Sequence, residues 1–229
     1  MSDHYWSKFW VEHGSASADA HPQAQVFRTL HREPIEQAKW EDTLAHISTS
    51  LAPGEQDRLL DLCGGNGLIA GALAKQCKDV VVVDISDGLL AHAGDRGANV
   101  RCLQGDMRAV EFEDGSFERV LCYAALQYLT LDEAVALFER VYRWLTPGGS
   151  FFVGDIPDAG RQWEFFNSPE RRSGYFSKLQ VGEPIVGTWF DRQWVSHLAA
   201  HAGFTGVEAV DQPESQIYSW FRFDLSCTK

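Results

Sequence analysis

Residues 59–68 read Leu59-Leu60-Asp61-Leu62-Cys63-Gly64-Gly65-Asn66-Gly67-Leu68. An apolar run reaches an acid, a glycine-rich turn follows at once, and the residues after the turn have the pattern of a helix. This order predicts a strand, a tight loop and a helix, with the loop placed so that a ligand can lie against the helix N-terminus. Glycines suit such a loop because they adopt backbone angles that a side chain forbids and let the main chain approach a ligand closely.

Short apolar runs alternate with helical patterns from Arg58 onward, which is typical of a parallel sheet wrapped by helices. The run of four valines at 80–83 fits a central strand that is buried on both faces. Strands are expected at 58–62, 80–83, 100–103, 117–122, 150–154, 207–210 and 218–225. Helices are expected at 68–76, 87–94, 132–145 and 191–201, and before the sheet within 5–20, at 24–31 and at 35–47.

Composition and charge narrow the classes of partner. The 229 residues carry a net charge of −12, and no cluster of Lys and Arg occurs. Nucleic-acid binding is therefore not expected, because phosphate contacts need basic patches. The start of the chain, residues 1–4, lacks the basic and apolar parts of a signal peptide, and no apolar run approaches the ~20 residues that span a bilayer. We therefore expect no membrane partner and a cytoplasmic location, in which the five scattered cysteines stay reduced.

Three acids fall at corresponding places, at or just after the ends of the first three expected strands: Asp61, Asp84 and Asp106. The carboxyl ends of parallel strands open to one rim, so these side chains should line one crevice. Asp84 lies roughly 20 residues past the glycine turn, as expected for a carboxylate that binds ribose hydroxyls. Asp106 could accept a hydrogen bond from an exocyclic amine, with Met107 and Ile85 packed on the two faces of a purine. Asp61, beside the loop, suits a cationic group of the ligand. The crevice therefore predicts an adenosine ligand with a positive, amino-acid-like tail.

With these motifs, residues 59–155 resemble the core of the class I S-adenosylmethionine-dependent methyltransferases of the small-molecule type. The motifs are Leu60-Asp61-Leu62-Cys63-Gly64-Gly65-Asn66-Gly67, Val83-Asp84-Ile85-Ser86, Gly105-Asp106-Met107, Asp114-Gly115-Ser116-Phe117-Glu118-Arg119-Val120, Cys122-Tyr123-Ala124-Ala125-Leu126-Gln127-Tyr128-Leu129 and Leu145-Thr146-Pro147-Gly148-Gly149. The resemblance implies a Rossmann-like, doubly wound α/β fold. Its seven-stranded, mostly parallel sheet would have the order 3-2-1-4-5-7-6, with strand 7 antiparallel and helices on both faces.

On this basis we expect residues 1–229 to form a single methyltransferase domain. Residues 1–50 would form an N-terminal helical lid or cap, 51–155 the cofactor-binding core, 156–190 an aromatic-rich insertion on the substrate side, and 191–229 a closing helix and strands. The aromatic residues near the start, Tyr5, Trp6, Phe9 and Trp10, are consistent either with a helix packed on the body or with a mobile lid. In the second case the small residues 14–18 would be its hinge.

The resemblance also implies roles for single residues. Asp61, Gly65 and Gly67 would hold the methionine moiety of S-adenosyl-L-methionine and Asp84 its ribose. Asp106 and Met107, with Ile85, would hold the adenine, and the backbone of Cys122 would contact the cofactor amino group. One departure is that Cys63 and Gly64 stand where glycine and then a variable residue are more usual. Asn66 also replaces a threonine.

The expected reaction is direct in-line displacement of a methyl group onto a small-molecule acceptor, aided by proximity and orientation. Tyr123, Gln127, Tyr128 and Asp155 are the candidate catalytic residues, and none of them declares itself as a general base. His197 and His201 have a zinc-compatible spacing but no third ligand nearby, so no metal is expected.

Two alternatives remain open. Residues 65–70 also fit G-x-G-x-x-A, which would suit an NAD(P)-dependent Rossmann-type enzyme, although a lone match of this kind is weak. The other is a non-catalytic cofactor-binding protein with the same fold.

Overall fold

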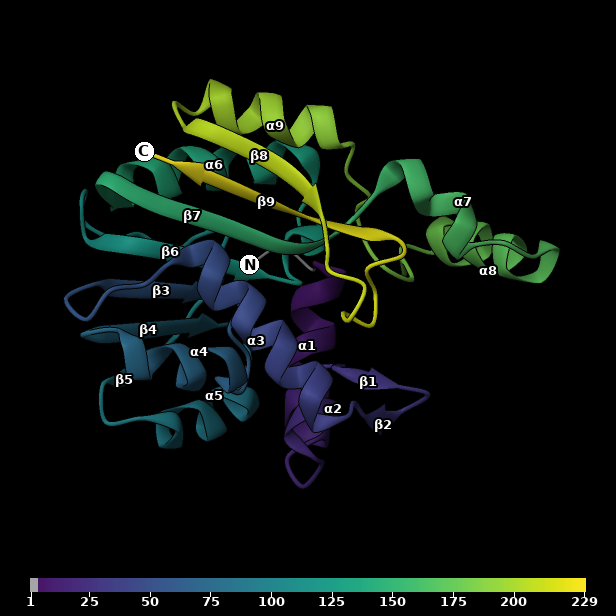
Figure 1. Cartoon of the computed structure of the whole chain (residues 1–229). Coiled ribbons are helices and arrows are strands. Elements are labelled where there is room, and N and C mark those ends of the chain that lie inside the picture. Colours follow the sequence, from purple (N-terminus) through teal and green to yellow (C-terminus); the bar gives the residue numbers. More distant parts are fainter. Residues whose placement is uncertain (1–3) are drawn as a thin grey trace.

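A seven-stranded sheet forms the centre of the molecule, with helices on both of its faces (Figure 1). The computed structural model describes residues 4–229. Residues 1–3, on which the expectation about a signal peptide partly rests, lie outside the described residues.

The strands of the sheet begin and end close to the expected positions. They are β3 (Arg58–Leu62), β4 (Asp79–Asp84), β5 (Val100–Gln104), β6 (Phe117–Tyr123), β7 (Leu145–Pro157), β8 (Thr205–Asp211) and β9 (Arg222–Thr228). The helices are α1 (Tyr5–Ala16), α2 (Pro22–Gln25), α3 (Gln37–Leu51), α4 (Leu68–Leu73), α5 (Asp87–Ala93), α6 (Leu131–Trp144), α7 (Gln162–Phe165), α8 (Pro169–Gln180) and α9 (Arg192–His201). A two-stranded hairpin pairs β1 (Thr29–Leu30) with β2 (Glu33–Pro34).

The strand order is β5-β4-β3-β6-β7-β9-β8. Strand β3 pairs in parallel with β4 and β6, and β9 runs antiparallel to β7 and β8. Numbered along the sheet-forming part of the chain, this is the order 3-2-1-4-5-7-6 with an antiparallel seventh strand. The predicted Rossmann-like fold is confirmed.

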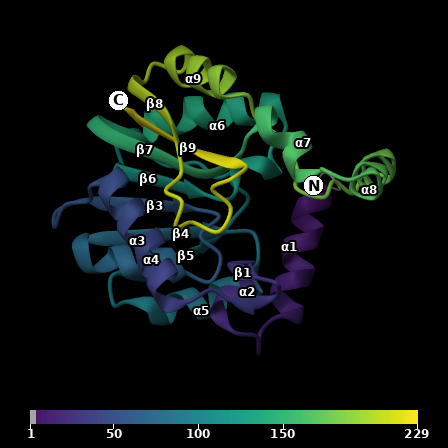
Figure 2. The same ribbon diagram turned by 45° about the vertical axis from the view of Figure 1, so that its right-hand side comes forward.

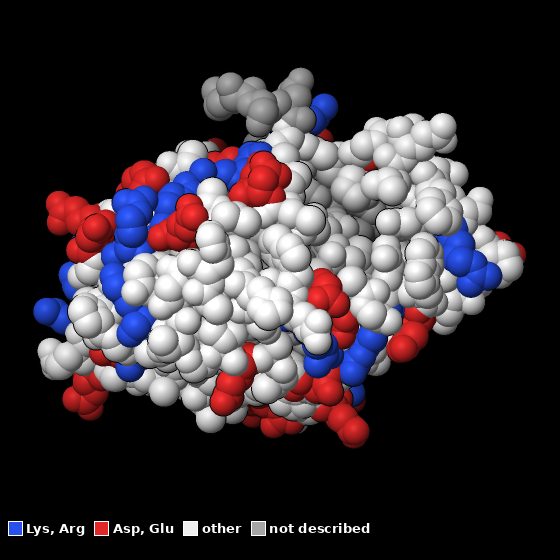
Figure 3. All heavy atoms as spheres, turned by 90° about the horizontal axis from the view of Figure 1, so that it is seen from above, with Lys and Arg blue, Asp and Glu red and all other residues white. Residues whose placement is uncertain are grey.

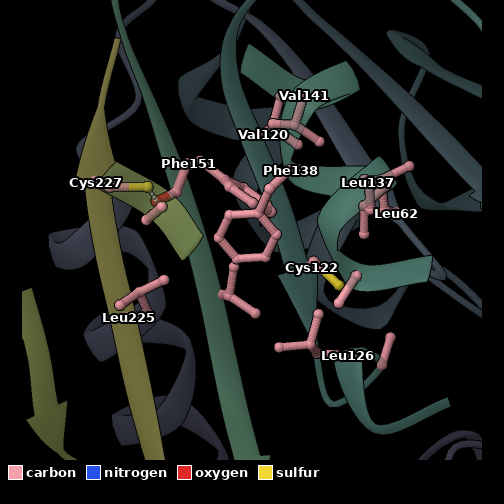
Figure 4. Close-up of a cluster of buried hydrophobic side chains, with 14 of the residues drawn as sticks. Leu62, Val120, Cys122, Leu126, Leu137, Phe138, Val141, Phe151, Leu225 and Cys227 are labelled. Atoms are coloured by element: carbon pink, nitrogen blue, oxygen red, sulfur yellow. Dashed lines mark hydrogen bonds between the residues drawn. The ribbon is translucent and has the colours of Figure 1, made fainter. Parts of the chain in front are cut away.

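Alternate residues of the strands fill two separate cores. On one face, Leu60 and Val120 pack with α6 and α9 in a cluster that also contains Phe138 and Phe151 (Figure 4). On the other face, Leu59 and residues of β4 and β6 pack with α3, α4 and α5. Because side chains alternate along a strand, Asp61 lies on the same face as Leu59.

The start of helix α6 is fixed by its N-terminal cap. Thr130 accepts a hydrogen bond from the Glu133 N–H, and the Glu133 side chain accepts from the Thr130 N–H. This capping box satisfies two backbone donors at the helix start.

Several sequence-based predictions of secondary structure were wrong in their bounds, and the helix expected at 35–47 runs instead from Gln37 to Leu51. The helix expected at 24–31 ends at Gln25, because Phe27 takes a positive φ of 53° and the chain then enters the β1–β2 hairpin. The last strand begins at Arg222 rather than at residue 218. Strand β7 is longer than expected at both ends, because it pairs with β6 at Leu145 and with β9 as far as Pro157.

Helices α7 and α8 lie within the predicted insertion and extend from one end of the sheet (Figures 1 and 2). No side chain of α8 is buried, and Trp163 and Phe176 are exposed. The face seen in Figure 3 has acidic and basic side chains intermixed on its left and along its lower edge, whereas its upper right part is mostly uncharged up to a group of basic side chains at the right end.

Candidate active site

A cavity of about 420 Å³ opens at the carboxyl ends of the central strands. This volume lies in the range of roughly 300–1,000 Å³ that is usual for small-molecule sites. Its wall is formed by the glycine-rich loop, by α1 and the turn that follows α2, by the residues after β6, by the insertion and by the segment that enters β9. The site therefore combines the predicted core with segments from both sides of it in the sequence.

The glycine-rich loop is built from left-handed backbone angles. Cys63, Gly65 and Gly67 have φ values of 57°, 56° and 71°. This conformation favours glycine, which explains why glycine is more usual at position 63 and shows that Cys63 adopts the same angle at some cost. Gly64 needs its lack of a side chain for another reason, since a Cβ there would lie 2.6 Å from Asp61 Oδ2.

Asp61 is a buried carboxylate without a hydrogen-bond partner at Oδ2 among residues 4–229. Burial, and next the charge of Asp84, raise the pKa of Asp61 to about 8. An ionised carboxylate in such a place is unfavourable unless a cation or a donor reaches it. The position therefore fits a ligand that brings a positive group to the loop.

Asp84 holds the glycine-rich loop through one carboxylate oxygen and the turn after β4 through the other. Its Oδ2 accepts from the Gly65 N–H at 2.9 Å and its Oδ1 accepts from the Ser86 N–H at 2.9 Å. Burial raises the pKa of Asp84 to about 6, although these backbone hydrogen bonds oppose the shift. Ile85, the next residue, lies in the cavity wall.

Asp106 is engaged by a residue that the sequence analysis did not single out. Arg108 Nε donates to both carboxylate oxygens of Asp106, and Arg108 Nη2 also donates to Ser7 Oγ of α1 at 2.6 Å. Burial would raise the pKa of Asp106, but these hydrogen bonds from Arg108 outweigh it and hold the pKa below its ordinary value. The adenine motif and α1 are thus joined by one charged network.

The structure brings part of the predicted set together. The predicted residues in the cavity wall are Asp61, Gly65, Asp84, Ile85, Tyr123, Gln127 and Tyr128. The predicted residues that do not contribute to this wall are Gly67, Asp106, Met107, Cys122 and Asp155.

Of the two tyrosines, Tyr123 is buried and Tyr128 is partly buried. The hydroxyl of Tyr123 donates to Gln216 Oε1 at 2.9 Å, and the ring of Tyr128 lies 4.8 Å, between centroids, from that of Trp6. Burial raises the pKa of Tyr128 to about 12 and that of Tyr123 well above its ordinary value. Neither side chain can act as a base near neutral pH, so both are hydrogen-bond donors or aromatic walls.

Asp155 does not contribute to the cavity wall. It is 1% exposed and forms ion pairs with Arg28, at 2.9 Å, and with Arg222, at 3.2 Å. Burial alone would raise the pKa of Asp155, but Arg222 and Arg28 outweigh it and lower the pKa. Both arginines line the cavity, and neither was a predicted site residue. The available signals were an isolated Arg28 and the charged pair Arg222 and Asp224 within an apolar strand.

Asn66 was noted only as a departure from the usual motif. Its Nδ2 donates to the Pro22 carbonyl at 2.8 Å and to Gln25 Oε1 at 2.7 Å, and the residue is fully buried. The asparagine therefore ties α2 to the glycine-rich loop.

Helix α1 crosses α5 with glycines at the contact. A Cβ on Gly88 would lie 2.8 Å from the carbonyl carbon of Gly14, and Gly14 is itself buried against Ser86. Trp6, Phe9 and Trp10 of the same helix lie in the cavity wall. Residues 14–16 of the expected hinge therefore belong to a packed helix.

Gly88→Ala should displace α1 and weaken the binding of S-adenosylhomocysteine, while the sheet stays folded. Overpacking of this kind costs about 1–3 kcal/mol, and here the cost should weaken the packing of α1 on α5. The measurements are hydrogen exchange of residues 5–16 and the affinity for S-adenosylhomocysteine. The matched control is Gly94→Ala at the C-terminal end of α5, where no atom lies within 4 Å of the new Cβ. Equal exchange in both variants would contradict the crossing.

The described part of the chain, residues 4–229, has no group of three or more His, Cys, Asp or Glu that could hold a metal ion. Among the helices of the same residues, none has the length and apolar character needed to cross a membrane.

Comparison with known proteins identifies related methyltransferases. Residues 59–149 match a family described as a methyltransferase domain. A demethylmenaquinone methyltransferase from Beutenbergia cavernae is 35% identical over 166 residues, which cover 68% of each chain. A Bacillus subtilis relative is 32% identical over 130 residues, so the chain spans about half (52%) of that protein's length.

Solved structures show the same fold. The phosphoethanolamine N-methyltransferase 1 of Haemonchus contortus, in complex with phosphoethanolamine and S-adenosylhomocysteine, superposes with a TM-score of 0.74 at 15% identity, covering 100% of this chain and 50% of that one. The second such enzyme of that organism, in complex with S-adenosyl-L-methionine, gives a TM-score of 0.65 at 20% identity, covering 83% and 52%. With its sheet order, its glycine-rich loop and these relatives, the chain belongs to the class I S-adenosylmethionine-dependent methyltransferases, whose cofactor is S-adenosyl-L-methionine.

Proposed function

We propose that this enzyme transfers the methyl group of S-adenosyl-L-methionine to a small-molecule acceptor that binds in the cavity beside the glycine-rich loop. The observation that carries the proposal is Asp61. A buried carboxylate with a free oxygen, next to a loop of left-handed backbone, is complementary to the ammonium group of an amino-acid-like tail.

The position of four residues in the cavity wall supports the cofactor roles that the family motif implies for them. Asp61 and Gly65 would hold the methionine moiety, Asp84 the ribose hydroxyls, and Ile85 one face of the adenine. Bound cofactor supplies a methyl group on a sulfonium, which a nucleophile can displace directly. For Gly67, Asp106, Met107 and Cys122 the assignments implied by the family motif stay predictions.

The acceptor would lie against the aromatic side of the cavity. Tyr123, Tyr128, Phe165, Tyr218 and Phe221 contribute rings to this part of the wall. Such a surface favours a compact, partly apolar or ring-bearing molecule. The relatives named above are enzymes for a quinone precursor and for phosphoethanolamine, so small acceptors of different chemistry are compatible with the fold.

Positioning would provide most of the rate enhancement. The tyrosine hydroxyls stay protonated, and Asp155 is held by two arginines. None of the four candidate catalytic residues is therefore suited to remove a proton. The proposed role of the chain is to align acceptor and methyl group and to exclude water, which can contribute about 7–11 kcal/mol to lowering the barrier.

Thermal unfolding with S-adenosylhomocysteine and with NAD tests the proposal against the dinucleotide alternative. We expect a rise in Tm with S-adenosylhomocysteine and none with NAD, because ligands that bind only the folded state stabilise it. A rise with NAD alone would contradict the proposal. Methyl transfer from labelled cofactor to a panel of small acids, phenols and amines then separates an enzyme from a non-catalytic binding protein.

A further inference from the structure

Two guanidinium groups face the acceptor side of the cavity. Arg28 comes from the turn after α2 and Arg222 from the first residue of β9, so they are 194 positions apart in the chain (222 − 28). Their side chains are 11% and 9% exposed, and both line the cavity. Buried arginines are rare unless acceptors surround them, so their partners decide what they can bind.

The acceptors within the protein are fewer than the guanidinium donors. Arg28 Nη1 and Arg222 Nη1 share a single carboxylate oxygen, Asp155 Oδ2. Arg222 Nη1 also donates to the backbone oxygen of Asp155 and weakly to Gln127 Oε1. The Nε of Arg222 is buried and has no acceptor among residues 4–229.

The neighbouring acid does not supply the missing acceptor. Asp224 accepts from the Asp155 N–H and from Gln212 through Oδ1, and His46 bonds to its other oxygen at 2.7 Å. One carboxylate oxygen therefore serves two guanidinium groups, and the Nε–H of Arg222 is left without an acceptor among residues 4–229. Asp155 takes a positive φ of 62°, a strained conformation that tends to persist at functional sites.

Aromatic rings fix the orientation of both arginines. Arg28 lies over Tyr123 and Tyr218, with its Cζ 5.2 and 5.8 Å from the ring centroids, and Arg222 lies over Phe221 at 5.0 Å. Stacked guanidinium groups keep their donor forks pre-organised. This arrangement matches the planar, bidentate recognition of carboxylate or phosphate.

We propose that Arg28 and Arg222 form an oxyanion subsite, so that the methyl acceptor carries a carboxylate or a phosphate group next to an apolar or aromatic body. The inference rests on the proposed function, since it takes the aromatic part of the cavity as the acceptor site. Asp155 is then a positioning residue that aligns the two guanidinium groups and partly neutralises them.

Calorimetry on protein saturated with S-adenosylhomocysteine tests the subsite with benzoate, phenyl phosphate and the neutral benzamide. We expect at least one anion to bind about tenfold or more tightly than benzamide, which corresponds to one charge-assisted hydrogen bond. The tighter anion identifies carboxylate or phosphate as the preferred group. Equal affinities for all three, or no binding of either anion at millimolar concentration, would overturn the inference.

Two variants with effects of opposite sign separate recognition from a purely structural role. Arg222→Gln should weaken anion binding about tenfold or more, while Asp155→Asn should strengthen it, because the arginines lose their competing carboxylate. A cluster that serves only folding predicts loss in both, and that outcome would refute the subsite. Arg101→Gln, at an exposed site on β5, is the control.

Binding of S-adenosylhomocysteine is measured in every variant. If it fails in the wild-type protein, the proposed function itself is wrong. If it is retained while the anions do not discriminate, only the oxyanion subsite is wrong. The comparison of benzoate with benzamide needs only wild-type protein, so the test does not depend on whether the variants fold.

Discussion

Replacing Asp84 with alanine should weaken the binding of S-adenosylhomocysteine by about a hundredfold or more, since hydrogen bonds to a charged group are worth roughly 1.5–3 kcal/mol each. Two effects add. The carboxylate proposed to accept the ribose hydroxyls is lost, and the N–H groups of Gly65 and Ser86 lose their acceptor. The loop that should hold the methionine moiety is then no longer fixed. Isothermal titration calorimetry measures the effect.

Asp87→Ala is the matched control for this change. Asp87 lies three residues further on, in the first turn of α5, and its exposed carboxylate accepts from the Gly88 N–H next to it. Its removal should leave the affinity within about twofold, as for most exposed sites. Near-wild-type affinity in a folded Asp84→Ala protein would remove Asp84 from the cofactor site. Thermal unfolding without ligand confirms that each variant is folded.

Cofactor binding at pH 7 should release about one proton from Asp61, because its pKa in the ligand-free protein is raised to about 8 and an ammonium partner favours the ionised form. The affinity should rise about tenfold per pH unit between pH 6 and 8, where binding must first remove this proton. At higher pH the affinity should fall again as the ammonium group of the ligand loses its charge. Calorimetry in buffers of different ionisation enthalpy counts the proton directly.

Asp61→Asn isolates the contribution of this carboxylate. The variant should bind S-adenosylhomocysteine more weakly at pH 8, release no proton and lose the rise in affinity between pH 6 and 8. The decline at higher pH, which comes from the ligand, should remain. A wild-type proton count of zero, or an unchanged pH profile in the variant, would be incompatible with an ammonium partner for Asp61.

The same pKa shift has a consequence for stability. The folded pKa of Asp61 is raised above its ordinary value, so the folded protein binds the proton that the unfolded chain has released. The tighter binding of the Asp61 proton in the folded state stabilises the protein fully below about pH 4. This stabilisation is lost progressively as the pH rises to about 8. Bound cofactor should offset this loss.

The sequence predicted the sheet and the first acids of the site because both depend on local patterns. Valine runs and glycine turns fix β4 and the loop after β3, and the rim is shared because parallel strands end together. Cys63, which stands where glycine is more usual, takes the left-handed backbone angle that glycine would take. The loop therefore keeps its shape despite this departure from the motif. The assignments of these acids to cofactor groups stay predictions until a complex is measured.

The arginines could not be predicted in the same way. Arg28, Arg108 and Arg222 owe their positions to contacts between segments far apart in the chain, 127 residues for the pair of Arg28 with Asp155. A strand pattern indicates that a charge is present, but only the packed fold shows that two guanidinium groups share one carboxylate. The hairpin after α2 was missed for a related reason, since positive φ values at Phe27, His31 and Arg32 go against the local propensity of these residues.

A crystal structure of the complex with S-adenosylhomocysteine tests the central proposal most directly. It should place the amino group of the ligand at the carboxylate of Asp61 and the ribose hydroxyls at Asp84. The sulfur should face the part of the cavity lined by Arg28, Tyr123 and Arg222. A ligand whose amino-acid end lies away from Asp61, or whose sulfur is turned from the arginines, would contradict the account.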